Sequence, residues 1–324
     1  MSEPRTGRSG VLVVGSVSAD VTAFADRLPR PGETVLGNTL TLVLGGKGAN
    51  QAVASARFGA PTWMIGCVGD DAFADLTSHG LQAAGVRLDQ LRRVSGPTGV
   101  AHIRVDASGQ NDIVIVPLAN SQLDREHVDA ALATLGGQAG VLLLQLEVPA
   151  DITAYAAAAG RRTGLTVVLD PAPAVPLPDE LWQHVDIVTP NESEAGVLSG
   201  VDVTDEPTAV AAGHWFLDRG VRHAIVTLGS AGAVAVSRDA EPVMFSPFRV
   251  AVVDTTAAGD AFTGTLGAAL AAGSELEAAI RHGMAAGALA VTRAGASPSL
   301  PARAEILALL DGQAGQETHR VAQH

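Results

Sequence analysis

Short runs of apolar, often β-branched residues alternate along the chain with segments whose apolar residues recur at helical spacing. The runs VLVVGSV (11–17), TWMIGCV (62–68) and LTVVLD (165–170) predict buried strands. The alanine-rich segment 48–59 predicts a helix that ends at a glycine. Strands and helices in alternation predict an α/β fold: a doubly wound, mostly parallel sheet with helices on both faces.

The same rhythm continues to about residue 311, which predicts a single domain over 1–324. Further helices are predicted at about 70–85, 124–135, 150–160, from 191, up to 220, and at 258–272, 275–293 and 301–311. Further strands are predicted at 140–148, 185–190, 222–229 and onward to about 253, with the last one ending at Asp254. The polar tail, 312–324, is predicted to fray.

Two segments, about 18–44 and 98–117, interrupt this rhythm. Both show alternating apolar and polar positions on either side of a turn, which predicts β-hairpins with one face exposed. We expect the two insertions to form a small separate sheet. Such a sheet needs a partner for its apolar face, either the mouth of an active site or another subunit.

Composition narrows the function classes. The net charge of −13, without a long run of basic residues, argues against a nucleic-acid or anionic-membrane partner. Cys67 is the only cysteine, so neither a disulfide within the chain nor a thiolate metal cluster is possible. The first residues carry no apolar signal segment, and no apolar run reaches the roughly 18 residues of a membrane span. These features predict a cytoplasmic protein.

The segment 252–264, VVDTTAAGDAFTG, is the strongest candidate for chemistry. Small residues lead into a helix, and free N–H groups at a helix start bind anions such as phosphate. Asp260 would repel a phosphate, so its place in this turn needs a reason. It is either an acid that complements the helix dipole or a general base that takes a proton from a hydroxyl attacking the phosphate.

Further polar residues follow predicted strands, where open α/β sheets bind ligands. They are Asp20, Glu147, Asn191 and Glu194, with the small-residue turn 227–232. Rival motifs are absent from the sequence. Gly48 rather than Ser or Thr follows Lys47, so 45–48 is not a Walker A loop, and no G-x-G-x-x-G follows the first strand. The nine histidines show no metal-ligand spacing.

Six segments together resemble the ribokinase family of sugar kinases. GGKGANQAV (45–53) and DTTAAGDAF (254–262) look like its two signature segments. The other four follow in the family's order: DPAPA (170–174), VTPNESEA (188–195), TLGSAG (227–232) and VTRAGASPSLP (291–301). The resemblance covers roughly residues 11–311. It implies a doubly wound α/β domain with a small β-sheet lid, which would be built here from the two insertions, and a homodimer formed through that lid.

The resemblance also implies roles for individual residues. Asp260 would be the catalytic base, and the N–H of Gly259 would help to form an anion hole. The implied sugar contacts are Ser18, Asp20, Gly46, Lys47, Asn50, Glu147 and Asp260. The implied ATP contacts are Asn191, Thr227, Gly229, Ser230, Gly232, Ala258, Gly259 and Met284. The implied potassium ligands are Asp254, Thr256, Ala290, Arg293, Gly295 and Ser299, and Asn191 and Glu194 would be associated with Mg²⁺.

The implied activity is ATP-dependent phosphorylation of D-ribose at its 5-hydroxyl. The acceptor residues are carboxylates and amides, which suit a neutral polyol rather than a phosphosugar. Ser18 departs from the family, which often has Asn there, so 2-deoxyribose or another pentose stays open. With 3% aromatic residues, a nucleoside acceptor is less favoured. A non-catalytic sugar sensor on the same fold is a further alternative.

Lys47 and Met284 are two further candidate residues of the site. Lys47 is the only lysine among 21 basic residues. We interpret it as a compact charge between sugar and phosphate, and the alternative is a composition biased toward arginine. Met284 stands where some family members have a histidine near the adenine, a change that we expect to alter only packing.

Overall fold

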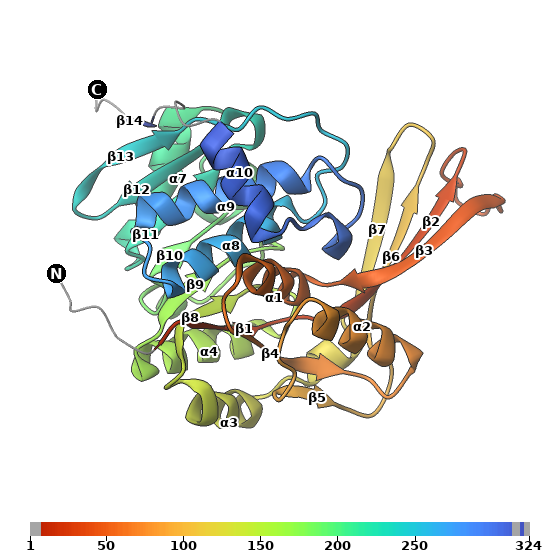
Figure 1. The fold of residues 1–324 in the computed structure, drawn as a ribbon. Coiled ribbons are helices and arrows are strands. Elements are labelled where there is room, and N and C mark those ends of the chain that lie inside the picture. The colour runs from red at the N-terminus through yellow and green to blue at the C-terminus, as the bar shows by residue number, and fades with distance from the viewer. Residues whose placement is uncertain (1–7, 313–317, 321–324) are drawn as a thin grey trace.

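The computed structural model describes residues 8–312 and 318–320, which form two sheets of different size (Figure 1). The large sheet has ten strands in the order β14-β13-β12-β11-β10-β9-β8-β1-β4-β5. Their bounds are β1 (Gly10–Val14), β4 (Thr62–Val68), β5 (Leu91–Arg93), β8 (Ala139–Leu144), β9 (Thr166–Leu169), β10 (Ile187–Val188), β11 (His223–Thr227), β12 (Ala233–Ser237), β13 (Ala240–Phe245) and β14 (Thr318–Arg320).

The strands from β11 to β5 in this order pair in parallel, whereas β12, β13 and β14 form an antiparallel edge. Parallel strands place their carboxyl ends at one edge of the sheet, where open α/β sheets bind ligands. The predicted doubly wound, mostly parallel sheet is confirmed.

Helices cover both faces of the large sheet (Figure 1). One face carries α1 (Lys47–Phe58), α2 (Ala72–Ala83), α8 (Ala258–Ala271), α9 (Leu276–Ala290) and α10 (Arg303–Gly312). The other carries α3 (Arg125–Leu135), α4 (Ala150–Thr163), α5 (Asp179–Trp182), α6 (Glu192–Ser199) and α7 (Glu206–Asp218). Alternate residues of β1 point to opposite faces of the sheet. Leu12 and Val14 pack against the helices of the second face, and Val11 and Val13 against those of the first.

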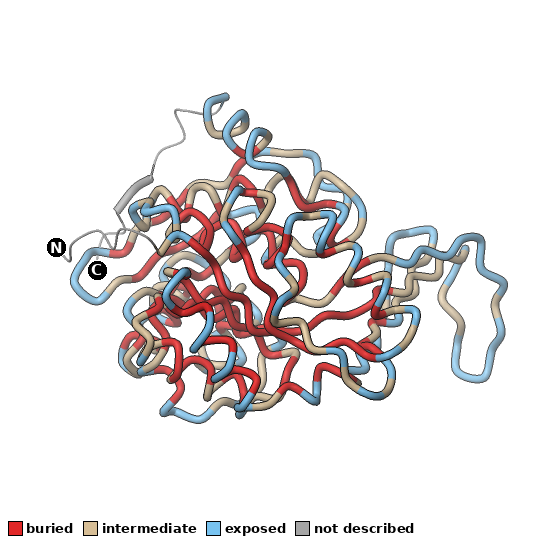
Figure 2. Tube along the Cα trace, turned by 60° about the horizontal axis from the view of Figure 1, so that its bottom comes forward, coloured by how far each residue is buried: buried red, intermediate tan, exposed pale blue. Residues whose placement is uncertain are grey.

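The small sheet is made from the two predicted insertions. Its strands, in the order β3-β2-β6-β7, are β2 (Ser18–Ala25), β3 (Gly37–Gly45), β6 (Gly99–Val105) and β7 (Asn111–Val116). The two hairpins are antiparallel, and β2 joins them by pairing with β6 in parallel. The sheet projects from the body of the molecule, and much of it is exposed (Figure 2).

Several predicted strands end earlier than expected. Strand β1 ends at Val14 and β8 at Leu144, so the residues that follow them are free to turn into a site. The strand predicted to reach Asp254 is wrong, because β13 ends at Phe245 and 246–254 contain no strand. Val252 and Val253 are 65% and 64% exposed there, so their β-branched side chains do not belong to a buried strand.

Of the tail predicted to fray, 313–317 and 321–324 lie outside the described residues. Gly312 ends α10, and β14 pairs with β13 rather than fraying. Shorter elements that the sequence did not predict are β5, α5 and the 3₁₀ turns η1 (Leu118–Gln122), η2 (Gly229–Ala231) and η3 (Ser297–Ser299). Within the described part of the chain, no helix is both long and apolar enough to cross a bilayer.

Candidate active site

The glycine-rich segment before α1 wraps around the side chain of Glu147. The backbone N–H of Lys47 donates to Glu147 Oε2 at 2.8 Å, and the Ser16 hydroxyl donates to the same oxygen at 2.6 Å. Gly46, with φ 89°, is the N-cap residue of α1, and a Cβ on Gly48 would lie 2.6 Å from the backbone nitrogen of Ser16. Glycine is therefore required here so that the start of α1 can approach the end of β1.

Asp260 lies in the first turn of α8, and its carboxylate faces α1. Asn50 Nδ2 donates to Asp260 Oδ2 at 2.8 Å, and Gln51 Nε2 lies 3.3 Å from Oδ1. The N-cap residue of α8 is Ala257, and no side chain caps this helix. Asp260 therefore does not cap α8, but as an acid in the first turn it complements the helix dipole, and its role as the general base stays a prediction.

A second buried acid, Asp170, shares the Gln51 carboxamide with Asp260. Gln51 Nε2 donates to Asp170 Oδ2 at 2.8 Å, and Gln145 Nε2 donates to Gln51 Oε1 at 2.6 Å. All four of these side chains are buried. Asn50 is buried as well, and among the described residues its Oδ1 has no hydrogen-bond partner, which leaves an acceptor atom inside the site.

Lys47 lies among the acids. Burial by itself would lower the pKa of its ammonium group, but the charges of Asp260, Asp170, Glu147 and Glu194 together raise that pKa above its usual value. We call Asp20, Glu147, Asp170 and Asp260, with Lys47, the carboxylate cluster. The acids surround the single lysine, and its predicted position between sugar and phosphate stays a prediction.

Burial is the largest influence on the pKa values of Asp20, Asp170 and Asp260. It raises the pKa of Asp20 to about 7, and the nearby charges of Glu147 and Asp260 add to the effect. It also raises the pKa of Asp170 and of Asp260, although the Lys47 ammonium acts in the opposite direction on both. A carboxyl group with a raised pKa is a better proton acceptor once it is ionised, which suits a general base.

Asp20 and Ser18 come from β2 of the small sheet. A Cβ on Gly45 of the neighbouring strand would lie 2.0 Å from Asp20 Oδ1, so the glycine makes room for this carboxylate. Ser18 is buried, and its hydroxyl oxygen lies 3.3 Å from Asn120 Nδ2. The small sheet thus supplies Asp20 to the same cluster as the large sheet's Glu147.

The predicted ATP contacts gather in main-chain turns. Asn191 caps α6 in a reciprocal box with Glu194: Asn191 Oδ1 accepts from the Glu194 N–H at 2.8 Å, and Glu194 Oε2 accepts from the Asn191 N–H at 2.9 Å. An isolated bridge joins Asn191 to Thr227 at the end of β11. There the turn 227–232 begins, and Gly229 and Ser230 within it are exposed.

The start of α8 forms a second turn. Ala257 has φ 60°, an unfavourable left-handed conformation for a residue other than glycine. Among the described residues, no atom lies within 4 Å of a Cβ built on Gly259, so a ligand can approach its main chain closely. We call 227–232 and 255–259 the backbone turns. Met284 packs half-buried against the apolar cluster beneath α9, and its predicted contact with adenine stays a prediction.

Two of the residues predicted to bind potassium, Thr256 and Gly295, contact Asp254. The Asp254 carboxylate accepts from the Thr256 N–H at 2.9 Å and from the Gly295 N–H at 2.8 Å. These hydrogen bonds lower its pKa although burial opposes them, so the group is a carboxylate near neutral pH. Ala290 ends α9, the side chain of Arg293 pairs with Glu305, and Ser299 is buried in η3.

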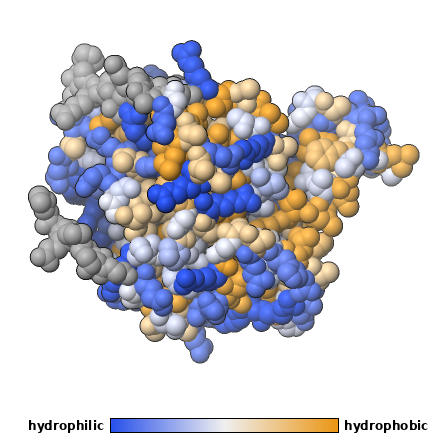
Figure 3. All heavy atoms as spheres, in the orientation of Figure 1, coloured by the Kyte–Doolittle hydropathy of each residue, from blue (hydrophilic) through white to orange (hydrophobic). Residues whose placement is uncertain are grey.

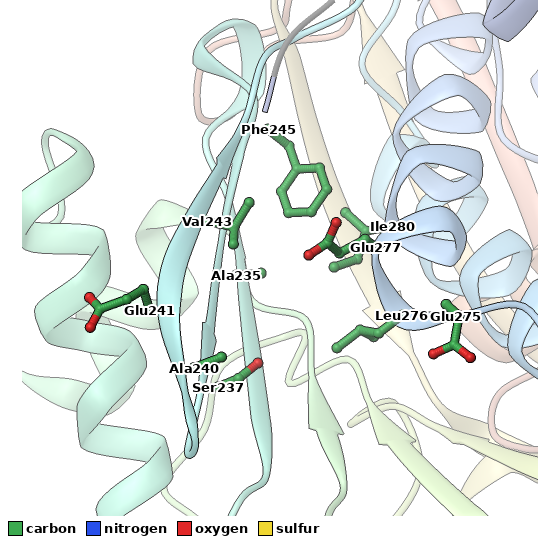
Figure 4. A pocket seen from close by; sticks show the side chains of 10 residues that line it. All are labelled: Ala235, Ser237, Ala240, Glu241, Val243, Phe245, Glu275, Leu276, Glu277 and Ile280. Carbon is green, nitrogen blue, oxygen red and sulfur yellow. The ribbon is translucent and has the colours of Figure 1, made fainter. Parts of the chain in front are cut away.

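A cleft of about 300 Å³ lies elsewhere, between the β12–β13 hairpin and the first turn of α9 (Figure 4). Figure 4 shows the Glu277 carboxylate beside this gap, whereas Glu241 points away from it. Ser237 pairs with His223, the first residue of β11, so this end of the hairpin lies toward the amino ends of the parallel strands. The cleft is therefore separate from the carboxylate cluster.

Comparison with known proteins identifies the family. The family model described as pfkB family carbohydrate kinase matches residues 8–303. The ribokinase of Haemophilus influenzae is 41% identical over 305 residues, which cover 94% of this chain and 99% of that protein. The chain belongs to the pfkB family of carbohydrate kinases.

Two more relatives of this kinase bear on its acceptor. A solved structure of Arabidopsis thaliana ribokinase complexed with ribose and ATP matches it with a TM-score of 0.86 and 36% identity, over 94% of this chain and 99% of that one. The deoxyribokinase of Salmonella typhi is 36% identical over 293 residues, which cover 90% of this chain and 95% of that protein.

The structure brings to the site four polar residues of this kinase to which sequence reasoning gave no role: Gln51, Asn120, Gln145 and Asp170. Asp170 ends the strand run LTVVLD, the same signal that singled out Asp20 and Glu147. Gln51 follows Asn50 in an alanine-rich helix, which is a weaker signal. Gln145 lies just past β8, within the apolar run predicted as a strand at 140–148, whereas Asn120 lies in a connecting turn and nothing in its local sequence marks it as buried.

Proposed function

We propose that this carbohydrate kinase transfers the terminal phosphoryl group of ATP to the 5-hydroxyl of D-ribose, with Asp260 as the general base. The observation that carries the proposal is the buried Asp260 carboxylate, fixed by Asn50 and Gln51 beside the exposed first turn of α8. The Haemophilus and Arabidopsis relatives, both named ribokinases, support ribose and ATP as the substrates.

In the proposed reaction, Asp260 accepts the proton of the sugar hydroxyl while the hydroxyl oxygen bonds to phosphorus and the bond to the β-phosphate oxygen breaks. A positioned base of this kind contributes about 10²–10⁴ in rate. The Gly259 N–H, in the free first turn of α8, donates to the charge on the transferred group. Lys47 neutralises charge between the acids and the phosphate, and Asp20, Asn50 and Glu147 hold the remaining sugar hydroxyls with Gly46.

One assay tests the proposal. ADP release is measured with D-ribose, 2-deoxyribose, adenosine and fructose 6-phosphate at equal concentrations, and the sugar product is mapped by phosphorus NMR. We expect ribose to give the highest kcat/KM and a phosphate on its 5-oxygen. A preference for adenosine or fructose 6-phosphate, or no ADP release with any acceptor, contradicts the proposal.

A second acceptor, 2-deoxyribose, is favoured by one observation. Ser18 stands in the acceptor-facing part of β2 with a hydroxyl rather than a carboxamide, and the Salmonella relative is named a deoxyribokinase. If Ser18 faces the 2-hydroxyl, Ser18→Asn raises the ratio of kcat/KM for ribose over 2-deoxyribose. An unchanged ratio means that other groups read this position.

A magnesium ion is implied by the family, and the residues present fit it in part. The Asn191 oxygen and one Glu194 oxygen are used in the capping box of α6, so only the second carboxylate oxygen of Glu194 is offered. Mg²⁺ commonly keeps several waters and binds through one or two carboxylates and substrate phosphates. Glu194 and the turn 227–232 would hold the metal–nucleotide complex, in which the ion neutralises phosphate charge.

A potassium ion is implied in the same way, and the segment around Asp254 fits it. An ionised carboxylate suits a hard cation, and the implied ligand set would be Asp254, Thr256, Ala290, Arg293, Gly295 and Ser299. Such a cation would fix the dipoles of the turn that leads into α8. Turnover is expected to fall when K⁺ is replaced by tetramethylammonium, and unchanged turnover counts against the site.

We further place the kinase in the cytoplasm, as a homodimer joined through the small sheet that acts as a lid. A single cysteine, buried, suits a reducing compartment. The small sheet leaves large apolar side chains exposed, and hydrophobic residues gather along it in Figure 3. They include Leu40, Leu42, Ile113 and Ile115. Light scattering of Ile113→Lys against the unmodified protein tests the dimer, which the charge is expected to dissociate.

A further inference from the structure

Asn120 lies at the junction where the chain leaves the large sheet for the small one. Its Oδ1 accepts from the Val17 N–H at 2.9 Å, and its Nδ2 donates to the Val17 C=O at 3.1 Å. The carboxamide thus pairs with both polar groups of one peptide residue, as a neighbouring strand would. Nδ2 also lies 3.3 Å from the Ser18 hydroxyl oxygen. Val17 and Ser18 link β1 to β2, so Asn120 fixes the first crossing between the sheets.

The surrounding chain is shaped to accommodate this side chain. Asn120 is 1% exposed, in the 3₁₀ turn η1, and Leu118 at the start of that turn has φ 48°. A left-handed leucine is strained, and such strain persists only where the surroundings enforce it. Gly99 on β6 completes the arrangement, because a Cβ there would lie 2.3 Å from Asn120 Nδ2.

The hydrogen bonds of Asn120 hold the start of β2, the strand that carries Ser18 and Asp20. Side chains two residues apart on a strand share a face, so Ser18 and Asp20 point the same way from β2. Because the Ser18 oxygen accepts from Asn120, the Ser18 proton is left to donate elsewhere. Both Nδ2 protons of Asn120 are used within the protein, so the residue itself has no donor left for a substrate.

We propose that Asn120 is a positioning residue for acceptor recognition, which holds the start of β2 and the Ser18 hydroxyl in the orientation that the sugar requires. This role extends the proposed function and depends on it in one respect, namely that the acceptor binds at the carboxylate cluster. Asn120 acts through Val17 and Ser18, so its removal should weaken binding of the acceptor and leave the nucleotide and the chemical step largely unaffected.

The test is the variant Asn120→Ala, with Thr98→Val as its matched control. Thr98 is also buried beside the junction, but its hydroxyl bonds the Gly69 N–H at 3.0 Å and Asp71 at 2.6 Å, on the side of the large sheet. We expect Asn120→Ala to raise KM for the acceptor by about ten- to hundred-fold, as the loss of three buried hydrogen bonds implies. The kcat and the KM for ATP should change less than about three-fold, and Thr98→Val should leave all three constants near wild type.

A double-mutant cycle with Ser18→Ala separates positioning from general stability. If Asn120 acts through the Ser18 hydroxyl, Asn120→Ala raises KM less in the Ser18→Ala background than in wild type. Equal effects of Asn120→Ala and Thr98→Val on KM, or an acceptor KM unchanged by Asn120→Ala, overturn the proposal. If the alanine variant does not fold, Asn120→Asp replaces it, because it keeps the shape and the acceptor for Val17 but lacks the NH₂ donor.

The acceptor for these measurements is the one that the wild type uses best in the four-compound assay. A wild type that prefers 2-deoxyribose or adenosine therefore contradicts the proposed substrate without affecting the test of Asn120. Conversely, a wild type active on ribose whose KM is insensitive to Asn120 contradicts the inference alone.

Discussion

The carboxylate cluster, to which Asp260 belongs, and the backbone turns are built from different groups. In the cluster, the carboxylates of Asp20, Asp170 and Asp260 are buried, and side chains hold the acid that we assign as the base, as Asn50 and Gln51 do for Asp260. In the turns, glycine, alanine and serine leave main-chain groups exposed, and Asp260 is the first buried residue after 255–259. In the proposed reaction, fixed side chains would therefore bind one substrate and main-chain groups the other.

This difference has a consequence for mutagenesis. A substitution in the cluster removes the atoms that bind or react, whereas a substitution in the turns leaves the main chain in place unless it changes φ or adds bulk. Effects on activity should therefore be large in the cluster and small in the turns, and they can be ordered by how directly each residue meets the reacting atoms.

The largest effect is expected at Asp260. Asp260→Asn keeps the shape and loses the base, so kcat should fall by about 10²–10⁴ while calorimetry still detects binding of both substrates. The control is Asp124→Asn, since Asp124 caps α3 by accepting from the His127 N–H, and asparagine caps almost as well. An Asp260→Asn enzyme that is folded and retains most of its kcat removes the catalytic assignment.

Asp20 should show opposite effects on activity and stability. Because burial raises its pKa to about 7, with Glu147 and Asp260 facing it and Lys47 within the same cluster, the folded protein binds a proton here between about pH 4 and 7 that the unfolded chain does not. The free energy of unfolding therefore falls as the pH rises from about 4 to 7 and Asp20 ionises. The loss is a few kcal/mol at most, because one pKa unit corresponds to roughly 1.4 kcal/mol.

Accordingly, Asp20→Asn should raise Tm at pH 8 and have little effect on it at pH 4. It should also raise KM for the acceptor by about ten- to hundred-fold at pH 8, since a hydrogen bond to a charged group contributes about 1.5–3 kcal/mol. In wild type, kcat/KM for the acceptor should fall below pH 7 as the carboxylate is protonated. Calorimetric scans and pH–rate profiles measure both effects, and a Tm gain of the same size at both pH values would refute the assigned titration.

An intermediate effect is expected at Gln51, which touches the base but not the substrate. Gln51→Met removes the donor to Asp260 while keeping the volume, so kcat near neutral pH should fall about ten-fold. In wild type, the hydrogen bond from Gln51 lowers the pKa of Asp260. Without it that pKa should rise, so the acid limb of the kcat profile should move to higher pH. Gln122→Met, which removes an exposed hydrogen bond to the Ser95 C=O, is the control and should leave the profile in place.

The smallest effect is expected in the turns. Ala257→Gly removes one methyl group from a left-handed position and leaves the main chain intact. The relief of strain and the greater freedom of the unfolded chain oppose each other, so the free energy of unfolding should change by no more than about 1 kcal/mol. The kcat and the KM for ATP should stay within about two-fold of wild type. A loss of activity comparable to that of Gln51→Met would erase the distinction between the two regions.

The sequence was sufficient to predict elements whose signal is local. The buried strands at 11–17 and 62–68, the helix that ends at Gly59 and the two hairpins appear with small shifts at their ends. The strand predicted to reach Asp254 failed because Val252 and Val253 carry a strand-like pattern at the surface, where β-branching reflects no partner strand.

In the site, the side chains that lie within recognisable motifs could be predicted from the sequence. Those whose hydrogen-bond partners lie far away along the chain could not. Gln51 meets Asp170 across 119 positions of the chain, and Asn120 meets Val17 across 103. No periodicity or spacing encodes such pairs, because the fold alone brings them together. The same holds for the pKa of Asp20, which depends on the burial that the two sheets create jointly.

The parallel pairing of β2 with β6 has a consequence for how the chain is made. Ser18 on β2 pairs with Gly99 on β6, which is synthesised 81 residues later (99 − 18). The strand that carries Ser18 and Asp20 therefore lacks this partner until β6 has been made. At 5–20 residues per second, a ribosome needs roughly 4–16 s to add that stretch. Until then the nascent chain can pair β2 only with β3, and the face that carries Ser18 and Asp20 is completed once the second hairpin has emerged.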